Sequence, residues 1–253
     1  MIQRFGNAVV RALSQLGEMT QLAFRFFGSI FSTFKLIQKL SDQIFLLGIK
    51  SLPASVITAA FIGMAFTLQI VREFEKFGAN YMVGGIVGLA IWRELGPLLT
   101  GVVVSARIGA AISSELASMK VTEQIDALKT LSQDPIKYLV VPRILSTVIM
   151  MPILVGIADV VGFLSGLFVA STIANINVHA YFHSASLMLS SFDIIGGLIK
   201  AVIFGFLIGL ISCYRGLNTK GGAKGVGDST TIAVVHSLMS IFVVNYFLSL
   251  VLF

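Results

Sequence analysis

The chain has 253 residues, of which 56% are hydrophobic and 12% charged, and its formal net charge is +6. The charged share is about half that of an average soluble domain, and the mean hydropathy is +0.94. So few charged side chains do not cover the surface of a water-soluble protein, which excludes a soluble enzyme and a disordered chain. The single cysteine, Cys213, excludes a disulfide scaffold. The composition therefore predicts an integral membrane protein.

The first fifty residues are expected to form an amphipathic helix at the membrane surface. Polar residues recur in steps of three and four, from Arg4 and Asn7 to Gln21 and Arg25, with apolar residues between them. This pattern is typical of a helix with a narrow polar stripe and a wide apolar face. It favours an interfacial helix, and packing against the other spans is a compatible alternative. The prediction divides the chain into an N-terminal interfacial unit, residues 1–50, and a transmembrane domain, residues 51–253.

Five later stretches are apolar over the length of about 20 residues that a helix needs to cross a bilayer. Their approximate bounds are residues 51–71, 82–106, 143–174, 194–213 and 230–253. Pro53 and Gly63 weaken the first stretch, for which a re-entrant hairpin is the alternative. The expected fold is an all-α membrane bundle of five spans.

The distribution of Lys and Arg predicts the orientation of these spans. The first fifty residues carry six, residues 107–143 carry five and residues 215–224 carry three, whereas residues 171–193 carry none. Cytoplasmic loops are enriched in Lys and Arg. We therefore expect the N-terminus and the 107–143 and 215–229 loops in the cytoplasm. The C-terminus would then lie outside.

The second predicted span contains two adjacent ionisable residues, Arg93 and Glu94. Charges within a span are costly and usually face a cavity or a partner. Adjacent helical residues point about 100° apart, so these two do not simply neutralise each other. We expect at least one of them to face a polar cavity or another helix, with structural ion pairing as the alternative. Asp159 and Lys200 pose the same question, although Lys200 could extend to the outer interface.

A stripe of apolar side chains runs along one face of the first span and beyond its end. Its members follow one another in steps of four, four and three: Phe66, Ile70, Phe74 and Phe77. This spacing places them on one face of a helix. Core packing is the default interpretation. The alternative is the wall of an apolar pocket that would suit an acyl chain.

Residues 115–134, in the loop between the second and third spans, are expected to form a short cytoplasmic helix that Asp134-Pro135 closes. Thr122 is its predicted N-cap, with Glu123 and Asp126 near the positive end of the helix dipole. The apolar positions share one face: Ile125, Leu128 and Leu131. Such a helix rests its apolar face on the membrane or on a cytoplasmic partner.

Motifs for catalysis or metal binding are missing: the sequence has no HExxH, GxSxG or CxxC. The glycine-rich stretch 221–227 is not a phosphate-binding loop, because no Ser or Thr follows Lys224. It is predicted to be a flexible cytoplasmic turn. His179 and His183 have the spacing of a ligand pair but lack an evident third ligand, so no metal or other cofactor is expected. His236 is expected to be packed or hydrogen-bonded within its span.

A long ordered string of residues occupies the second span and the loop after it. It runs from Arg93-Glu94-Leu95-Gly96-Pro97 through residues 106–112 and 119–128 to Val141-Pro142-Arg143. This string resembles the MlaE-type permease family of ABC lipid transporters. Residues 214–231 and 61–64 look like the same family. The resemblance covers roughly residues 50–250 and is strong in the 93–143 block.

The resemblance implies a homodimer at the centre of a complex in a bacterial inner membrane, with the N-terminus cytoplasmic and the C-terminus periplasmic. A cytoplasmic ABC ATPase subunit would dock on the loop helix, and a hexameric ring of MCE-domain protein would handle lipid on the periplasmic side. A STAS-domain subunit is left open, and nucleic acid is not an expected partner. The docking residues would be Thr122, Glu123, Gln124, Ile125, Asp126, Ala127 and Leu128.

The resemblance also implies a phospholipid cavity between the two chains. The positions that match it would be Phe66, Ile70, Phe74, Phe77, Arg93 and Glu94. The complex would maintain outer-membrane lipid asymmetry or supply lipid, and the ATPase partner alone would be the enzyme.

Two other classes of protein are alternatives to a permease. A stand-alone secondary transporter or channel explains the charges within the spans but not the elaborate 107–143 loop. An intramembrane enzyme requires a nucleophile–base pair or a metal site, and the sequence shows neither.

Overall fold

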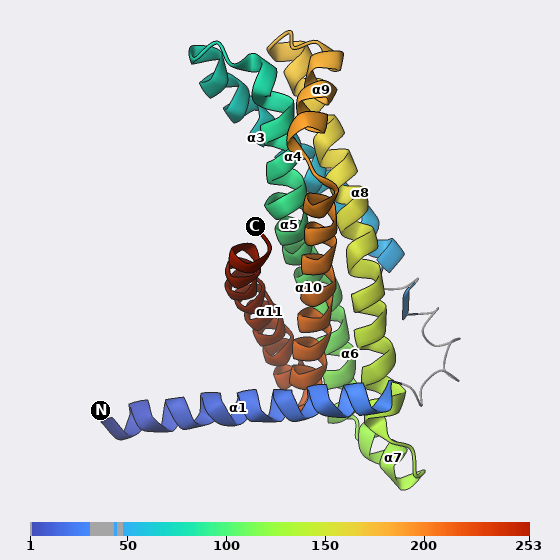
Figure 1. Cartoon of the computed structure of the whole chain (residues 1–253). Coiled ribbons are helices and arrows are strands. Elements are labelled where there is room, and N and C mark those ends of the chain that lie inside the picture. Colours follow the sequence, from blue (N-terminus) through green and yellow to red (C-terminus); the bar gives the residue numbers. More distant parts are fainter. Residues whose placement is uncertain (1, 31–42, 45–47) are drawn as a thin grey trace.

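The computed structural model describes residues 2–30, 43–44 and 48–253, and all regular structure in these residues is helical. The described helices form a tall bundle, and α1 lies across one end of it, here named the α1 end (Figure 1). Five stretches are long and apolar enough to cross a membrane: Ile49–Lys76, Asn80–Val121, Ile136–Ile173, Ser191–Leu217 and Gly222–Leu252. The expected all-α membrane protein is confirmed, and each span starts or ends beyond its predicted bounds.

Helix α1 (Ile2–Ser29) packs on the bundle through some of its apolar side chains and leaves others exposed. Leu22 and Phe26 are buried against the bundle, and the Phe26 ring centroid lies 5.7 Å from that of Phe206. Other apolar side chains of α1 are exposed, among them Leu13 and Phe24. An exposed apolar face on a helix that lies across the bundle suits a membrane surface. Residues 31–42 and 45–47 of the expected N-terminal unit lie outside the described residues.

The first span is the 3-10 turn η3 (Ile49–Ser51) followed by α3 (Leu52–Lys76). α3 is one unbroken helix of 25 residues rather than the two arms of a re-entrant hairpin. Pro53 stands in its first turn, where a missing N–H costs nothing. Gly63 faces the backbone of Gly162 on α8 so closely that a Cβ would overlap the Gly162 carbonyl. Pro53 thus helps to start α3, and Gly63 allows its close packing against α8.

The second span is a composite helix that continues to Val121, well beyond the expected end at residue 106. Two π turns, η5 and η6, interrupt its α-helical hydrogen bonding. In chain order it consists of η4 (Asn80–Met82), α4 (Val83–Ala90), η5 (Ile91–Leu95), α5 (Gly96–Val104), η6 (Ser105–Gly109) and α6 (Ala110–Val121). Such single π turns are frequent at functional sites. η5 contains both Arg93 and Glu94.

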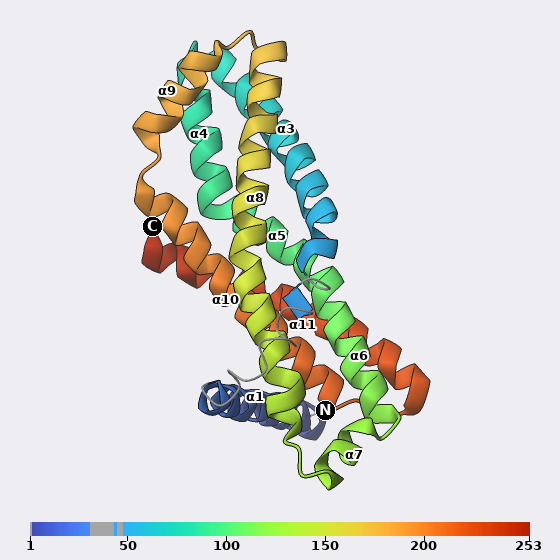
Figure 2. The same ribbon diagram turned by 90° about the vertical axis from the view of Figure 1, so that its right-hand side faces the viewer.

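The remaining elements are α7 (Gln124–Thr130), the π turn η7 (Ile136–Val140), α8 (Val141–Ile173), α9 (Val178–Met188), α10 (Ser191–Leu217) and α11 (Gly222–Leu252). α7 lies at the α1 end, whereas α9 meets α3 and α4 at the opposite end (Figures 1 and 2). α11 is tilted, and the C-terminus lies midway along the bundle (Figure 2).

Helix α9 occupies the connection between the third and fourth spans, for which no helix was predicted. The Asn177 side chain caps it by accepting a hydrogen bond from the His179 amide at 2.8 Å. Ser184 Oγ accepts a hydrogen bond from the Gly85 amide at 3.0 Å. Glycines in α4 let the two helices touch, because a Cβ at Gly84 would overlap the Tyr181 carbonyl.

The glycine-rich stretch is a helix start rather than the predicted flexible turn. α11 begins at Gly222, directly after Gly221, whose φ of 93° is open to glycine. Tertiary packing holds this start in place. A Cβ at Gly225 would overlap the Lys220 carbonyl, and Thr219 Oγ1 donates to Ser229 Oγ at 2.8 Å.

Two apolar clusters fill the bundle. The one nearer the α1 end includes Ile108, Ile112, Leu116, Ile144, Phe204 and Ile208. The one nearer the opposite end includes Val71, Val83, Val87, Phe163 and Tyr181. Arg93 and Glu94 lie where the composite helix passes from one cluster to the other.

The contact between α3 and α8 predicts a difference between two Gly→Ala variants. Gly63→Ala should destabilise the protein by about 1–3 kcal/mol, the usual cost of overpacking, because its methyl group meets backbone that cannot rotate away. Gly156→Ala on α8 is the matched control, since the space around Gly156 is open and alanine favours a helix over glycine. Thermal unfolding in detergent measures both. Equal melting temperatures would contradict the close contact.

Candidate functional site

Arg93 of η5 forms an ion pair with the fourth span. Its Nε lies 2.8 Å from Asp193 Oδ1, and its guanidinium carbon lies 4.7 Å from the ring centroid of the terminal Phe253. Asp193 also caps α10, because its Oδ2 accepts hydrogen bonds from the amide and hydroxyl of Ser190. The Arg93 side chain remains 36% exposed, whereas Asp193 is buried. The cation is therefore fixed in position and still accessible.

Glu94 is held by side chains from two further helices. Lys200 Nζ of α10 donates to Glu94 Oε1 at 2.6 Å. Ser249 Oγ of α11 donates to the same oxygen at 2.6 Å, and Asn245 Nδ2 donates to Oε2 at 2.9 Å. Lys200 is fully buried, so the expectation that it extends to the outer interface is wrong. Its ammonium stays inside because it donates to three oxygens there: Glu94 Oε1, Ser249 Oγ and the Arg93 carbonyl.

The third oxygen partner of Lys200 follows from the local sequence. In a regular α-helix the carbonyl of residue 93 would accept the amide of residue 97, but Pro97 has no N–H. Lys200 Nζ bonds the Arg93 carbonyl at 2.9 Å instead. Gly197, one turn before Lys200, lies so close that a Cβ would overlap the Trp92 carbonyl. The Gly-Pro sequence after the π turn therefore brings the backbone of the second span within reach of the Lys200 side chain.

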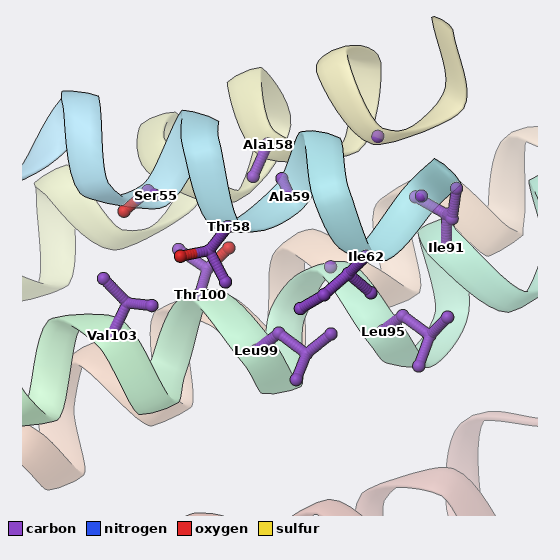
Figure 3. A pocket seen from close by; sticks show the side chains of 13 residues that line it. Ser55, Thr58, Ala59, Ile62, Ile91, Leu95, Leu99, Thr100, Val103 and Ala158 are labelled. Carbon is purple, nitrogen blue, oxygen red and sulfur yellow. The ribbon is translucent and has the colours of Figure 1, made fainter. Parts of the chain in front are cut away.

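Asp159 of α8 lies on the other side of the same turn. A Cβ at Gly96 would overlap its carboxylate, so the two helices are in direct contact there. Asp159 is buried, and neither of its oxygens has a hydrogen-bond partner among the described residues. A small cavity lies next to this contact, between α3, α5 and α8 (Figure 3). Its volume of about 20 Å³ is room for about one water molecule and not for an acyl chain.

The aromatic stripe of the first span lies apart from these charges. Phe66, Ile70 and Phe74 pack against the apolar cluster at the end opposite α1, next to Val71. Phe77 follows the end of α3 and is 81% exposed. Within one chain, therefore, the structure brings Arg93 and Glu94 together with residues of α10 and α11, and not with the stripe.

The sequence prediction missed Asn245 and Ser249 altogether and assigned no partners to Asp193 and Lys200. One signal was available, because Asp193 and Lys200 are seven residues apart and therefore share a face after two helical turns. Their charges are complementary to those of Arg93 and Glu94. Uncharged Asn and Ser in an apolar span carry no comparable signal.

The expected loop helix is α7, which is shorter than predicted. Thr122 is not its N-cap, because α6 continues to Val121 and Thr122 Oγ1 donates back to the Ser118 carbonyl at 2.9 Å. Glu123, with a φ of 60°, occupies the cap position and makes no capping hydrogen bond with its side chain. Ile125 is buried, and Leu128 packs against the apolar cluster nearer the α1 end. The apolar face of α7 is thus used mainly within the chain.

The exposed side of the same segment carries a fixed charge. Asp126 lies 2.7 Å from Lys129 Nζ and 2.9 Å from Lys120 Nζ. Hydrogen bonds from these two lysines lower the pKa of Asp126 from 3.8 to about 2. The stabilisation from this depressed pKa is complete above about pH 4 and is lost as the pH falls through about 2. Asp126 therefore stays ionised at neutral pH.

The Lys200–Glu94 pair predicts a destabilisation that a second change relieves. Lys200→Met should lower stability by about 2 kcal/mol, less than the roughly 3–5 kcal/mol of a fully buried pair, because Glu94 is 37% exposed. Adding Glu94→Gln should restore part of the loss. Lys76→Met is the control, since the Lys76–Glu73 pair is exposed at 64% and 62% and contributes little. Thermal unfolding in detergent measures the stability of each variant. If the double variant lost as much stability as the two single changes added together, the pairing would be contradicted.

Comparison with known proteins places these residues in a family. Residues 40–251 match the family model described as Permease MlaE. A Rickettsia typhi protein and a Synechocystis protein, both described as "Probable ABC transporter permease protein", are 42% and 45% identical to the chain. These two alignments cover 98% and 84% of this chain and 96% and 81% of the relatives. The Arabidopsis thaliana protein named TRIGALACTOSYLDIACYLGLYCEROL 1, chloroplastic, is 44% identical over 80% of this chain and 58% of its own length. The chain therefore belongs to the MlaE permease family, the non-enzymatic membrane subunits of ABC transporters whose ATPase is a separate subunit.

Proposed function

We propose that this permease moves phospholipid between a bacterial inner membrane and a periplasmic MCE-domain protein. The observation that carries the proposal is the charged cluster of η5, in which Arg93 and Glu94 are firmly held and still about one-third exposed within an apolar span. A guanidinium suits a lipid phosphate. The name of the Arabidopsis relative refers to a galactolipid, which supports a lipid as the cargo.

A homodimer would complete the lipid cavity. The pocket beside the turn of Arg93 and Glu94 holds about one water molecule and is too small for a phospholipid. The least buried span is α11, which exposes Phe242, Tyr246 and Phe247 beside Asn245. A second copy on the C-terminal half of α11, around Asn245, would enclose a space between two charged clusters. Acyl chains would then lie along apolar side chains, with the stripe of Phe66, Ile70, Phe74 and Phe77 toward its rim.

The α1 end would face the cytoplasm, as the excess of Lys and Arg there favours. An ABC ATPase would dock at this end on Thr122, Glu123, Gln124, Ile125, Asp126, Ala127 and Leu128. The opposite end, where α3, α4 and α9 meet, would face the periplasm and the MCE ring (Figure 1). A STAS-domain subunit beside the ATPase is compatible with this arrangement.

The continuity of the second span suggests how ATP hydrolysis would act on lipid. Residues 80–121 form one continuous helical stretch, and α7 follows it after two residues. Movement of a docked ATPase would pass from α7 through α6 and α5 to the π turn of Arg93 and Glu94. Transfer requires lipid to bind the two states of the permease differently. Rearrangement of the Arg93 and Glu94 side chains would supply that difference.

Lipid transfer from proteoliposomes to the isolated MCE partner tests the proposal. Glu94→Ala and Phe77→Asp should each lower the transfer rate at least tenfold, because the first frees Lys200 and the second places a charge in the acyl path. Glu75→Ala, an exposed position beyond the cluster, is the control. All variants should co-purify with the ATPase as the unchanged protein does. Unchanged transfer by both site variants would refute the assigned cavity.

Docking on α7 predicts a charge effect at Asp126. Asp126→Arg should reduce co-purification of the ATPase by about tenfold. The variant would place three positive side chains together, whereas in the structure the Asp126 carboxylate pairs with both Lys120 and Lys129. Glu75→Arg, with the same charge change at the opposite end, should leave the yield unchanged. Full co-purification of the Asp126 variant would exclude this helix as the docking site.

A further inference from the structure

We propose a second phospholipid site, separate from the Arg93–Glu94 cluster, in a groove between α1, α10 and α11. Its occupant is a phospholipid of the membrane leaflet at the α1 end, held by its phosphate. The proposal rests on the chain lying in a membrane and does not depend on the transport reaction proposed above.

The groove has room for the phosphate and first acyl carbons of a lipid, and its walls are mostly apolar. Its volume is about 270 Å³, against about 20 Å³ for the cavity beside Gly96. Four apolar side chains from the three helices form its walls: Leu16, Met19, Ile211 and Met239. The polar part of the lining comes from Gln15, Arg215, His236 and Ser240, none of which is acidic.

Arg215 supplies the charge that a phosphate needs. One of its terminal nitrogens, Nη2, lies 3.0 Å from Gln15 Oε1 and 2.7 Å from His236 Nδ1. Its Nε is buried and has no partner in the described part of the chain, where no carboxylate forms an ion pair with Arg215 either. By contrast, Arg93 and Arg143 each pair with a carboxylate. A guanidinium has five N–H donors, of which the two on Nη1 remain for the oxygens of a phosphate.

His236 adds a second donor through its tautomer. Arginine has no acceptor, so Nδ1 of His236 must accept the hydrogen bond from Arg215. The ring proton of the neutral imidazole is then on Nε2, which makes that nitrogen a donor. Ser240 lies four residues further along α11, on the same helical face, and adds a hydroxyl. A guanidinium, an imidazole N–H and a hydroxyl around an acid-free groove favour an anion.

The position of the groove favours a lipid over soluble phosphate. Arg215 lies in the last turn of α10, at the end of the bundle that α1 crosses (Figure 1). The neighbouring Tyr214 hydroxyl donates to Glu18 of α1 at 2.7 Å, which ties this turn to α1. α1 exposes Leu13 and Leu16, as a helix at the level of lipid headgroups does. Free phosphate would leave the apolar walls unused, whereas a phospholipid covers them with the first carbons of its acyl chains.

Photo-crosslinking of the full complex in nanodiscs of phosphatidylglycerol and phosphatidylcholine tests the site. The crosslinker p-benzoylphenylalanine replaces Met239, a groove residue that is 62% exposed, or Val160 on the outside of α8 as a bulk-lipid control. We expect Arg215→Gln to lower phospholipid capture at position 239 at least fivefold and to leave capture at position 160 unchanged. Arg215→Lys, which keeps the charge and loses the paired donors, should give an intermediate value. It also provides a folded variant if the Gln change destabilises the protein.

Two results would overturn the proposal. One is equal phospholipid capture at position 239 with and without the Arg215 side chain. The other is a crosslink from position 239 to a second copy of this chain, which would make the groove a subunit contact. Arg93→Gln should leave capture at position 239 unchanged, so a failure of the transport proposal would be distinguishable from a failure of this one.

Discussion

The buried bond between Lys200 and Glu94 determines how the second, fourth and fifth spans meet. An ammonium and a carboxylate within an apolar span are each costly, and they are tolerated together because each satisfies the other. Lys200 is fully enclosed and also bonds the Arg93 carbonyl and Ser249. Its position therefore depends on the π turn, on Pro97 and on the end of α11 at once. The rest of the site is arranged around this constraint.

Glycine makes that arrangement possible. Close approach at Gly96 and Gly197 places backbone against Asp159 and Trp92, where any side chain would separate the helices. The α3–α8 and α4–α9 contacts use Gly63 and Gly84 in the same way. In a lipid environment, small residues let helices gain packing contacts that a hydrophobic effect between helices does not supply. These glycines thus lie at helix crossings, and Gly96 and Gly197 are the two beside the charged turn.

The sequence was a good guide to spans and a poor guide to partners. Apolar runs located all five spans because hydropathy is a local property. Asp193 and Lys200 could have been matched to Arg93 and Glu94 by charge, but their distances depend on a π turn that no periodicity reveals. α9 and the helical start at Gly222 were missed for a related reason. Both depend on tertiary contacts, such as Gly85 with Ser184 and Thr219 with Ser229, that override local composition.

The two proposed phosphate sites, at Arg93 and at Arg215, differ in a way that bears on the proposed transport of lipid. Arg93 is already neutralised by Asp193, so a phosphate there must compete with a carboxylate and would bind weakly enough to leave. Arg215 has no carboxylate partner among the described residues, so a phosphate there gains the full charge interaction. A site meant for cargo must release it, whereas a site for a structural or waiting lipid need not. The compensated charge therefore suits the proposed transport path, and the uncompensated one suits the proposed lipid that stays with the protein between transport cycles.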